Sequence, residues 1–194
     1  GRSNVFDGHL SLDHLGHIFR GEITIWSEVG GSARPIRFID RPESSDTRLI
    51  LSRYGVLDER DRDEGNSADE TRDGAQIIQL DTDDTAKVIQ QLDKDGIGYA
   101  IANQVQDQTK IKLVKIAILM DTLPNEASYP YSQFRGYAYR RGNAEAVQPF
   151  INFANGDTGK SAVVAAKAAE AQAVNLALQP RLPSSGADGN SGFP

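Results

Sequence analysis

The sequence predicts an α/β fold in which a mostly parallel sheet is flanked by helices. Strand-like apolar runs and helical patterns alternate between residues 36 and 101 in the order β, α, β, α, β, which favours parallel strands. The hydrophobic content of 39% and the charged content of 25% are those of ordinary globular proteins. A chain of 194 residues is also long enough to bury a substantial core, as one domain or two small lobes.

The first predicted elements are a helix and a strand. In "LSLDHLGHIFRGEITIW", which starts at residue 10, the helical period puts four apolar side chains on one face: Leu12, Leu15, Ile18 and Phe19. Ser11 stands where it can cap the start of this helix, and Gly21 where it can end it. The following "GGSARPIRFID" predicts a turn that leads into a strand of about residues 36–39.

The middle of the chain completes the alternation. We expect a helix of about residues 45–54, a strand in "AQIIQL", a capped helix in "DDTAKVIQQLDKDG" and a strand in "IGYAI". Residues 58–73 carry eight acids against three arginines and almost nothing apolar, which predicts a solvated loop whose role stays open.

The C-terminal third predicts two strands, two helices and a tail. "IKLVKIAILM" and "FRGYAYRR" have strand patterns, "NAEAVQPFINFAN" has a helical pattern, and the alanine-rich run from Ser161 to Leu178 has strong helix propensity. Residues 181–194 predict a flexible tail. No apolar run approaches the roughly 20 residues needed to cross a bilayer.

Composition excludes several classes of function. A formal net charge of −6 argues against a nucleic-acid-binding protein, because neutralising phosphates takes a basic face. The absence of cysteine excludes disulfides, thiolate chemistry and zinc sites of the cysteine type. His9, His14 and His17 lie close together but no acid stands at a compelling ligand spacing, so we expect surface histidines and no metal site.

Nothing in the sequence points to catalysis or to a cofactor. No arrangement of serine, histidine and acid stands out. "NGDTGKSA", residues 155–162, has part of a phosphate-binding P-loop, but Ala154 occupies a position that requires glycine and the segment follows a helix. We therefore expect a helix-to-helix turn there.

The stretch "FIDRPESSDTRLIL", residues 38–51, is the best candidate for a ligand site. Pro42 ends the predicted strand, and the first turn of the next helix leaves backbone N–H groups that attract anions. Hydroxyls can add donors, Arg41 can add a charge-assisted contact, and Glu43 can pair with Arg41 or accept a proton from the ligand. The donors would be Ser44, Ser45 and Thr47. Taken alone, the motif favours an ordinary N-cap that binds only water.

Four segments in order resemble one family, the phosphate-binding periplasmic solute-binding proteins of ABC transporters. "LSLDHLGHIFRGEITIW" resembles its "L-S-x-x-x-L-x-x-I-F-x-G-x-I-T-x-W" segment. "DRPESSDTR" stands where the family has its "R-x-D-G-S-G-T-T" anion loop, and "DKDGIGYA" resembles its "G-A-I-G-Y" strand, with Asp95 in place of the first glycine. "YPYSQFRGYAY" is similar to its "Y-P-[IL]-x-R-x-x-x-x-Y" return strand.

The resemblance implies roles for residues of the loop. Arg41 matches the family's ligand-binding arginine, Glu43 its acidic partner, and Ser45 and Thr47 its hydroxyl donors. Ser44 and Asp46 stand where the family has glycines, and the carboxylate of Asp46 adds negative charge beside an anion site. The ligand-binding set expected by resemblance and local chemistry is Arg41, Glu43, Ser44, Ser45 and Thr47.

The resemblance also implies a division of the chain. Within the two-lobed type II periplasmic-binding-protein fold, residues 1–115 would be the second lobe, which carries the anion loop. Residues 116–180 would be the returning segment of the first lobe, and residues 181–194 the flexible tail. Family members begin with a further segment that is not recognisable here, so exposed sheet edges and pairing with a second copy are expected.

The implied function is that of the ligand-binding component of an ABC transporter. It would bind phosphate or a similar oxyanion non-covalently in the periplasm and present it to an ABC permease, with no cofactor and no catalysis. One alternative is a sensing or binding module of the same fold that does not serve transport. Another is an enzyme that acts on phosphoesters through the same anion pocket.

Overall fold

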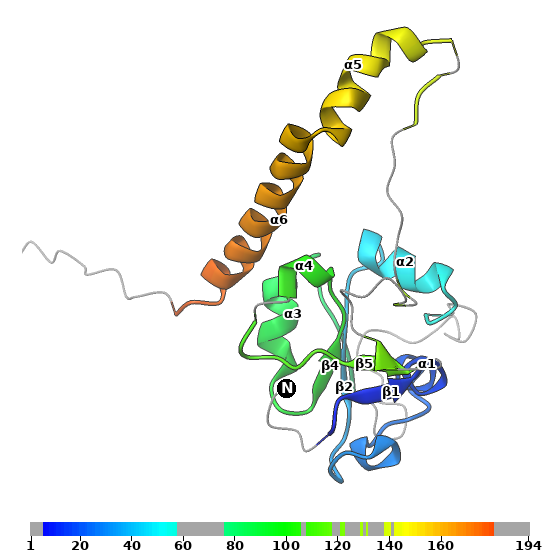
Figure 1. The fold of residues 1–194 in the computed structure, drawn as a ribbon. Coiled ribbons are helices and arrows are strands. Elements are labelled where there is room, and N and C mark those ends of the chain that lie inside the picture. Colours follow the sequence, from blue (N-terminus) through cyan, green and yellow to red (C-terminus); the bar gives the residue numbers. More distant parts are fainter. Residues whose placement is uncertain are drawn as a thin grey trace, which may run out of the picture.

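The structure is a computed structural model that describes residues 6–57, 76–105, 108–117, 121–122, 129, 131, 138–140 and 142–180. Of the two sheets that the described residues form, one is fully parallel (Figure 1). Its central strand β2 (Arg37–Asp40) pairs with β3 (Gln76–Gln79) on one side and with β4 (Gly96–Gly98) on the other. These are the three strands of the predicted alternation, so the prediction of a parallel sheet is confirmed.

The second sheet joins distant parts of the chain. Strand β1 (His9–Ser11) pairs in parallel with β5 (Lys115–Ala117), and β6 (Asp121–Thr122) pairs antiparallel with β5. The lobe boundary predicted at residue 115 therefore falls inside a sheet whose first strand comes from the N-terminal segment. That boundary stays a prediction.

The helices near the sheets start at polar caps. The Ser11 hydroxyl accepts the His14 N–H at the start of α1 (Leu12–Phe19), and Gly21, with φ 74°, follows the end of that helix. Ser45 and Asp84 accept backbone N–H groups at the starts of α2 (Asp46–Arg53) and α3 (Thr85–Leu92). A short 3-10 helix, η1 (Trp26–Val29), and a single turn, α4 (Ala102–Val105), complete this part.

The main core lies between α1, η1 and the two sheets. Leu15, Ile18 and Phe19 of α1 are buried in it, as their helical spacing predicts. The Phe19 ring packs against Phe38 of β2 with ring centroids 4.6 Å apart. The other face of β2 contributes Ile39, which is fully buried in a smaller cluster with Leu80 and Val88.

Gly96 lets the end of α3 pass close to β4. A Cβ at this position would lie 2.2 Å from the backbone oxygen of Leu92, a distance that no side chain can adopt without a shift of the main chain. The first glycine of "DGIGYA", Gly96, is thus required by packing, because helix α3 and strand β4 meet there without an intervening side chain.

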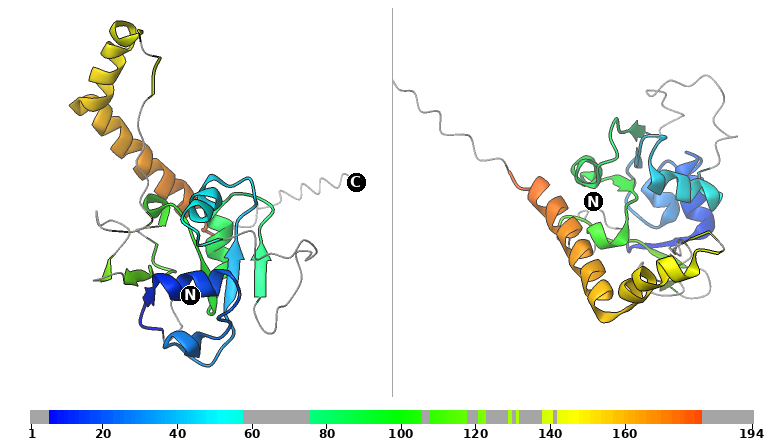
Figure 2. Two further views of the ribbon diagram at one scale, coloured as in Figure 1. Left: turned by 90° about the vertical axis from the view of Figure 1, so that its right-hand side faces the viewer. Right: turned by 90° about the horizontal axis from the view of Figure 1, so that it is seen from above.

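Two long helices form an arm that projects from the body of the molecule. Helix α5 (Ala144–Asn155) has no buried residue, and α6 (Asp157–Ala177) runs back so that its C-terminal half lies beside α4 (Figures 1 and 2). Asn103 donates a hydrogen bond to Glu170 there, and Gln108 donates one to Asn175. Since Gly156 joins the two helices, "NGDTGKSA" is the helix-to-helix turn that was expected.

Several predictions fall outside the described residues, namely the acidic loop 58–73, the tail 181–194 and most of the strand expected at 134–141. The described part of that last segment, residues 138–140, is not a strand. Within the ranges that the structure describes, no helix has both the length and the apolar character needed to cross a bilayer.

A surface cluster after α1 predicts an unusual titration. Hydrogen bonds from the Arg20 guanidinium and from His17 lower the pKa of Glu22 to about 2. Because this pKa is depressed in the folded state, the stabilisation is present above the ordinary value of 4.5 and is lost as the pH falls towards 2. Its size is small, because Glu22 is half exposed and water screens the pair.

We expect Glu22 to titrate near pH 2 in the native protein and nearer 4.5 in Arg20→Ala, as followed by carboxyl-carbon NMR. A native Glu22 that titrates near 4.5 would show that these pairs do not form in solution.

Candidate anion site

The candidate site lies at the carboxyl edge of the parallel sheet. Strand β2 ends at Asp40, and the chain turns through residues 41–45 into α2, while β3 leads into α3 and β4 into α4. The N-termini of the helices that follow parallel strands converge at this edge, which is where open α/β sheets bind ligands. The loop "RPESSDT" follows the central strand and is therefore at the middle of the edge.

Arg41 is a buried cation at this edge. Its side chain is only 3% exposed, and three of its nitrogens have described partners. Nε donates to the Tyr99 carbonyl at 3.1 Å, Nη1 to Asp83 Oδ1 at 2.5 Å and Nη2 to Thr85 Oγ1 at 2.7 Å. The guanidinium carbon also lies 5.9 Å from the centroid of the Tyr99 ring, within range of a cation–π interaction. Partners from the residue after β4, from α3 and from the loop before α3 thus orient Arg41.

A buried ion pair lies beneath Arg41. Asp40 is fully buried and accepts a hydrogen bond from Arg48 Nε at 3.2 Å, and Arg48 itself is buried. Tyr99 donates its hydroxyl proton to Asp40 at 2.6 Å, and the Arg41 backbone N–H donates to the same oxygen at 2.8 Å. Burial, followed by the adjacent Asp40 charge, raises the pKa of Tyr99 well above its usual range, so the phenol stays protonated and remains a donor.

The start of α2 places the other predicted site residues. Ser45 is fully buried, and its hydroxyl accepts the Arg48 N–H as the helix cap. Glu43, Ser44 and Asp46 are exposed and Thr47 is half-buried. This turn therefore presents both carboxylate and hydroxyl side chains to solvent. Ser45 thus acts as an ordinary N-cap, and the binding of an anion at this turn stays a prediction.

The acid that pairs with Arg41 is Asp83, where the resemblance implied Glu43. Asp83 and Thr85 come from the segment "DTDDT", 42 and 44 residues beyond Arg41. Gln104 of α4 extends this group by accepting the Thr85 hydroxyl proton at 2.6 Å. The sequence analysis did not single out these residues or Tyr99, although carboxylates directly after a parallel strand were an available signal.

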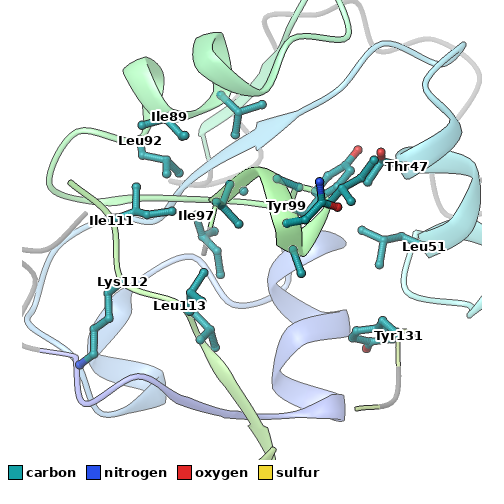
Figure 3. A pocket seen from close by; sticks show the side chains of 18 of the residues that line it. Thr47, Leu51, Ile89, Leu92, Ile97, Tyr99, Ile111, Lys112, Leu113 and Tyr131 are labelled. Atoms are coloured by element: carbon teal, nitrogen blue, oxygen red, sulfur yellow. The ribbon is translucent and has the colours of Figure 1, made fainter. Parts of the chain in front are cut away.

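A large cavity borders the loop and takes in Thr47 at the end of the loop. It has a volume of about 960 Å³ and mostly apolar walls, with Thr47 and Tyr99 in its lining but not Arg41, Glu43, Ser44 or Ser45. Figure 3 shows Thr47 and Leu51 on one side of this cavity and Ile111 and Leu113 on the other. An apolar lining offers few partners to an oxyanion, so the polar loop, and not the cavity, remains the candidate anion site.

The histidines form no metal centre in the part of the chain that the structure describes. No group of three or more histidine, aspartate or glutamate side chains there is arranged to hold a metal ion. His17 instead contacts Glu22 on the surface.

Comparisons with known proteins agree with this fold. The Phosphate-binding protein PstS of Bacillus subtilis (strain 168) is 25% identical over 161 residues, which are 80% of this chain and 48% of that protein. A candidate phosphate ABC transporter substrate-binding protein from Clostridium perfringens, solved with bound phosphate, is 26% identical with a TM-score of 0.52. The match covers 82% of this chain and 61% of that one.

A second solved structure shows likeness of fold. An ABC-type phosphate transport receptor from Vibrio cholerae has a TM-score of 0.62 at 20% identity, over 86% of this chain and 65% of that chain. This chain thus spans about half the length of the curated relative and less than two thirds of each solved one. The family model described as a PBP superfamily domain matches residues 2–158, which is most of the chain. The parallel sheet, the loop at its carboxyl edge and this match show that the chain belongs to the PBP superfamily, with a periplasmic-binding-protein-like α/β fold.

Proposed function

We propose that this chain is part of the solute-binding component of an ABC transporter and binds phosphate or a similar oxyanion without covalent chemistry. The observation that carries the proposal is the position of Arg41. This buried, oriented cation follows the central strand of the parallel sheet and stands beside the accessible first turn of α2. Backbone N–H groups at a helix start and a guanidinium are the donors that oxyanions prefer.

The names of the relatives support this ligand class. The Bacillus subtilis protein is named as phosphate-binding, and the Clostridium perfringens protein was solved with phosphate bound. Both are described as binding proteins, which favours binding over turnover of a phosphoester. We propose Arg41, Ser44 and Thr47 as direct ligand contacts, and Ser45 as the cap that shapes the turn. Glu43, the exposed acid of the same turn, is proposed to accept a proton from the ligand.

The proposal extends to partners and location. A periplasmic binding protein delivers its ligand to a membrane permease when two lobes close around it. Residues 1–115 would form one lobe and residues 116–180 the returning segment of the other. β3 and β4 are the outer strands of the described parallel sheet, so pairing of a sheet edge with a second copy is proposed as well.

Calorimetric titration of the full chain with phosphate and with sulfate tests the site. We expect saturable binding of at least one of these anions, and a loss of at least about tenfold in affinity for Arg41→Ala, since a charge-assisted and desolvated contact is removed. Arg41→Lys should fall between the two proteins, because lysine keeps the charge but loses the planar fork.

Arg34→Ala is the matched control. Arg34 is half exposed and pairs with Asp95, away from the loop. Its replacement therefore changes the net charge as much as Arg41→Ala does, without touching the site. Circular dichroism checks that each variant is folded. If neither anion binds the wild-type chain, or if Arg41→Ala binds as well as Arg34→Ala, the proposed site is wrong.

A further inference from the structure

Arg41 and Asp83 form an ion pair in which one side chain is buried and the other is partly exposed. The Arg41 side chain is 3% exposed and the Asp83 side chain is 41% exposed, although the two groups are 2.5 Å apart. Asp83 belongs to the short segment between β3 and α3 and directly precedes the Asp84 cap of α3. A buried, oriented cation is thus paired with a carboxylate at the surface that can turn towards water.

The remaining partners of Arg41 do not depend on Asp83. Nε is held by the Tyr99 carbonyl, and Nη2 by the Thr85 hydroxyl, which is in turn fixed by Gln104. Arg41 would therefore keep its orientation after Asp83 turned away, with Nη1 facing the vacated position. That position has the chemistry of an oxyanion site, because a carboxylate oxygen and a phosphate oxygen accept the same charge-assisted hydrogen bond.

We propose that Asp83 is an internal counter-ion that occupies the place of the oxyanion on Arg41 and that the ligand displaces. The proposal rests on the function proposed above. Without ligand, Asp83 neutralises a guanidinium that would otherwise be buried and unpaired, which is unfavourable. When an oxyanion binds, it takes over that pairing and the carboxylate moves into solvent.

Two opposite effects follow for any variant that lacks this carboxylate. The ligand-free protein loses stability, because Arg41 is left buried without its acid. The affinity for an oxyanion rises, because the anion no longer competes with Asp83 and no longer meets its negative charge. A residue that merely orients Arg41 for the ligand would instead lower the affinity when it is replaced.

The test compares Asp83→Asn with Asp81→Asn in the full chain. Asp81 lies in the same segment, is strongly exposed and pairs with Lys87, so its replacement changes the charge equally without touching Arg41. Phosphate affinity is measured by calorimetry at constant ionic strength, and the melting temperature is measured in phosphate and in chloride. We expect Asp83→Asn to bind phosphate about tenfold more tightly than wild type. The phosphate affinity of Asp81→Asn should differ from that of wild type by less than about threefold, because water and salt screen a charge at the surface.

The melting temperature gives a second readout. Asp83→Asn should melt below wild type in chloride and gain more from added phosphate than wild type or Asp81→Asn gains. Should Asp83→Asn fail to fold, Asp83→Ser keeps a hydrogen-bond acceptor near Arg41 without the charge and should show the same tightening.

The outcomes separate this inference from the function on which it rests. If wild type binds phosphate and both Asp83 variants bind it equally or more weakly, Asp83 is not a displaced counter-ion and the inference is overturned while the function stands. If wild type and all variants bind neither phosphate nor sulfate, the proposed function and the inference are both wrong.

Discussion

Asp40→Asn is expected to lower the free energy of unfolding by about 3–5 kcal/mol, because it removes the buried carboxylate that pairs with the buried Arg48 charge. Both side chains of this pair are almost completely inaccessible, at 0% and 3% exposure. Asparagine keeps the size of aspartate and an oxygen that can accept from Tyr99, so the substitution acts mainly on the contact with Arg48. Urea denaturation followed by circular dichroism gives the measurement.

Glu43→Gln is the matched control for this prediction. It removes one negative charge from the same loop, but Glu43 is exposed, so the stability should change by less than about 0.5 kcal/mol. The double variant Asp40→Asn, Arg48→Met should recover part of the lost stability, since the cation that Asp40 neutralises is then absent as well. A single Asp40→Asn variant within about 1 kcal/mol of wild type would show that the two charges are not paired in solution.

Trp26→Ala is expected to destabilise the protein by about 3–5 kcal/mol, because it removes a buried aromatic side chain from the main core. The Trp26 ring is buried and lies 5.1 Å from the Phe6 ring, centroid to centroid. Its indole N–H also donates to the Asp95 carbonyl at 2.9 Å, directly before β4. The side chain therefore ties η1 to the strand that leads into Tyr99.

Two further variants separate packing from hydrogen bonding at this position. Trp26→Phe keeps most of the packing and should cost only about 1–3 kcal/mol, chiefly for the lost hydrogen bond to the Asp95 carbonyl. Ile25→Ala changes the neighbouring residue, which is 42% exposed, and should cost less than about 1 kcal/mol. Since Trp26 is the single tryptophan, unfolding must be followed by circular dichroism and not by fluorescence. Equal stabilities for Trp26→Ala and Ile25→Ala would contradict the assignment of Trp26 to the core.

These two predictions also bear on the candidate site. The Asp40–Arg48 pair fixes the end of β2 below Arg41, and Trp26 anchors the start of β4, which carries Tyr99 towards the same guanidinium. Neither position is a proposed ligand contact, and both support the segments that hold Arg41 and Tyr99. We therefore expect variants at either position to lose anion affinity only as far as they lose the folded state.

The local elements were predictable because their causes are local. The Ser11 cap, a serine cap at the start of α2, the end of α1 near Gly21 and the turn between α5 and α6 depend on residues within a few positions of one another. The order of strands and helices that favours a parallel sheet is likewise a short-range pattern repeated along the chain. The loop with Arg41 could be located in the same way, since a strand, a proline and a capped helix follow each other directly.

The partners of Arg41 could not be predicted from the sequence. Glu43 is two residues away and matches the family's acid, yet Asp83 is the acid that pairs with Arg41, because parallel pairing of β2 with β3 brings the segment after β3 to the end of β2. Contacts of the same long range join Asp40 with Tyr99, and β1 with β5.

The sequence alone thus determined the fold class, the helix caps and the loop that carries Arg41, since each depends on residues that are close along the chain. The tertiary structure alone decided which acid neutralises Arg41 and which side chains bury Asp40. The physical reason is that a buried charge is paired by whichever groups the sheet brings within hydrogen-bonding distance, however far apart they stand in the sequence.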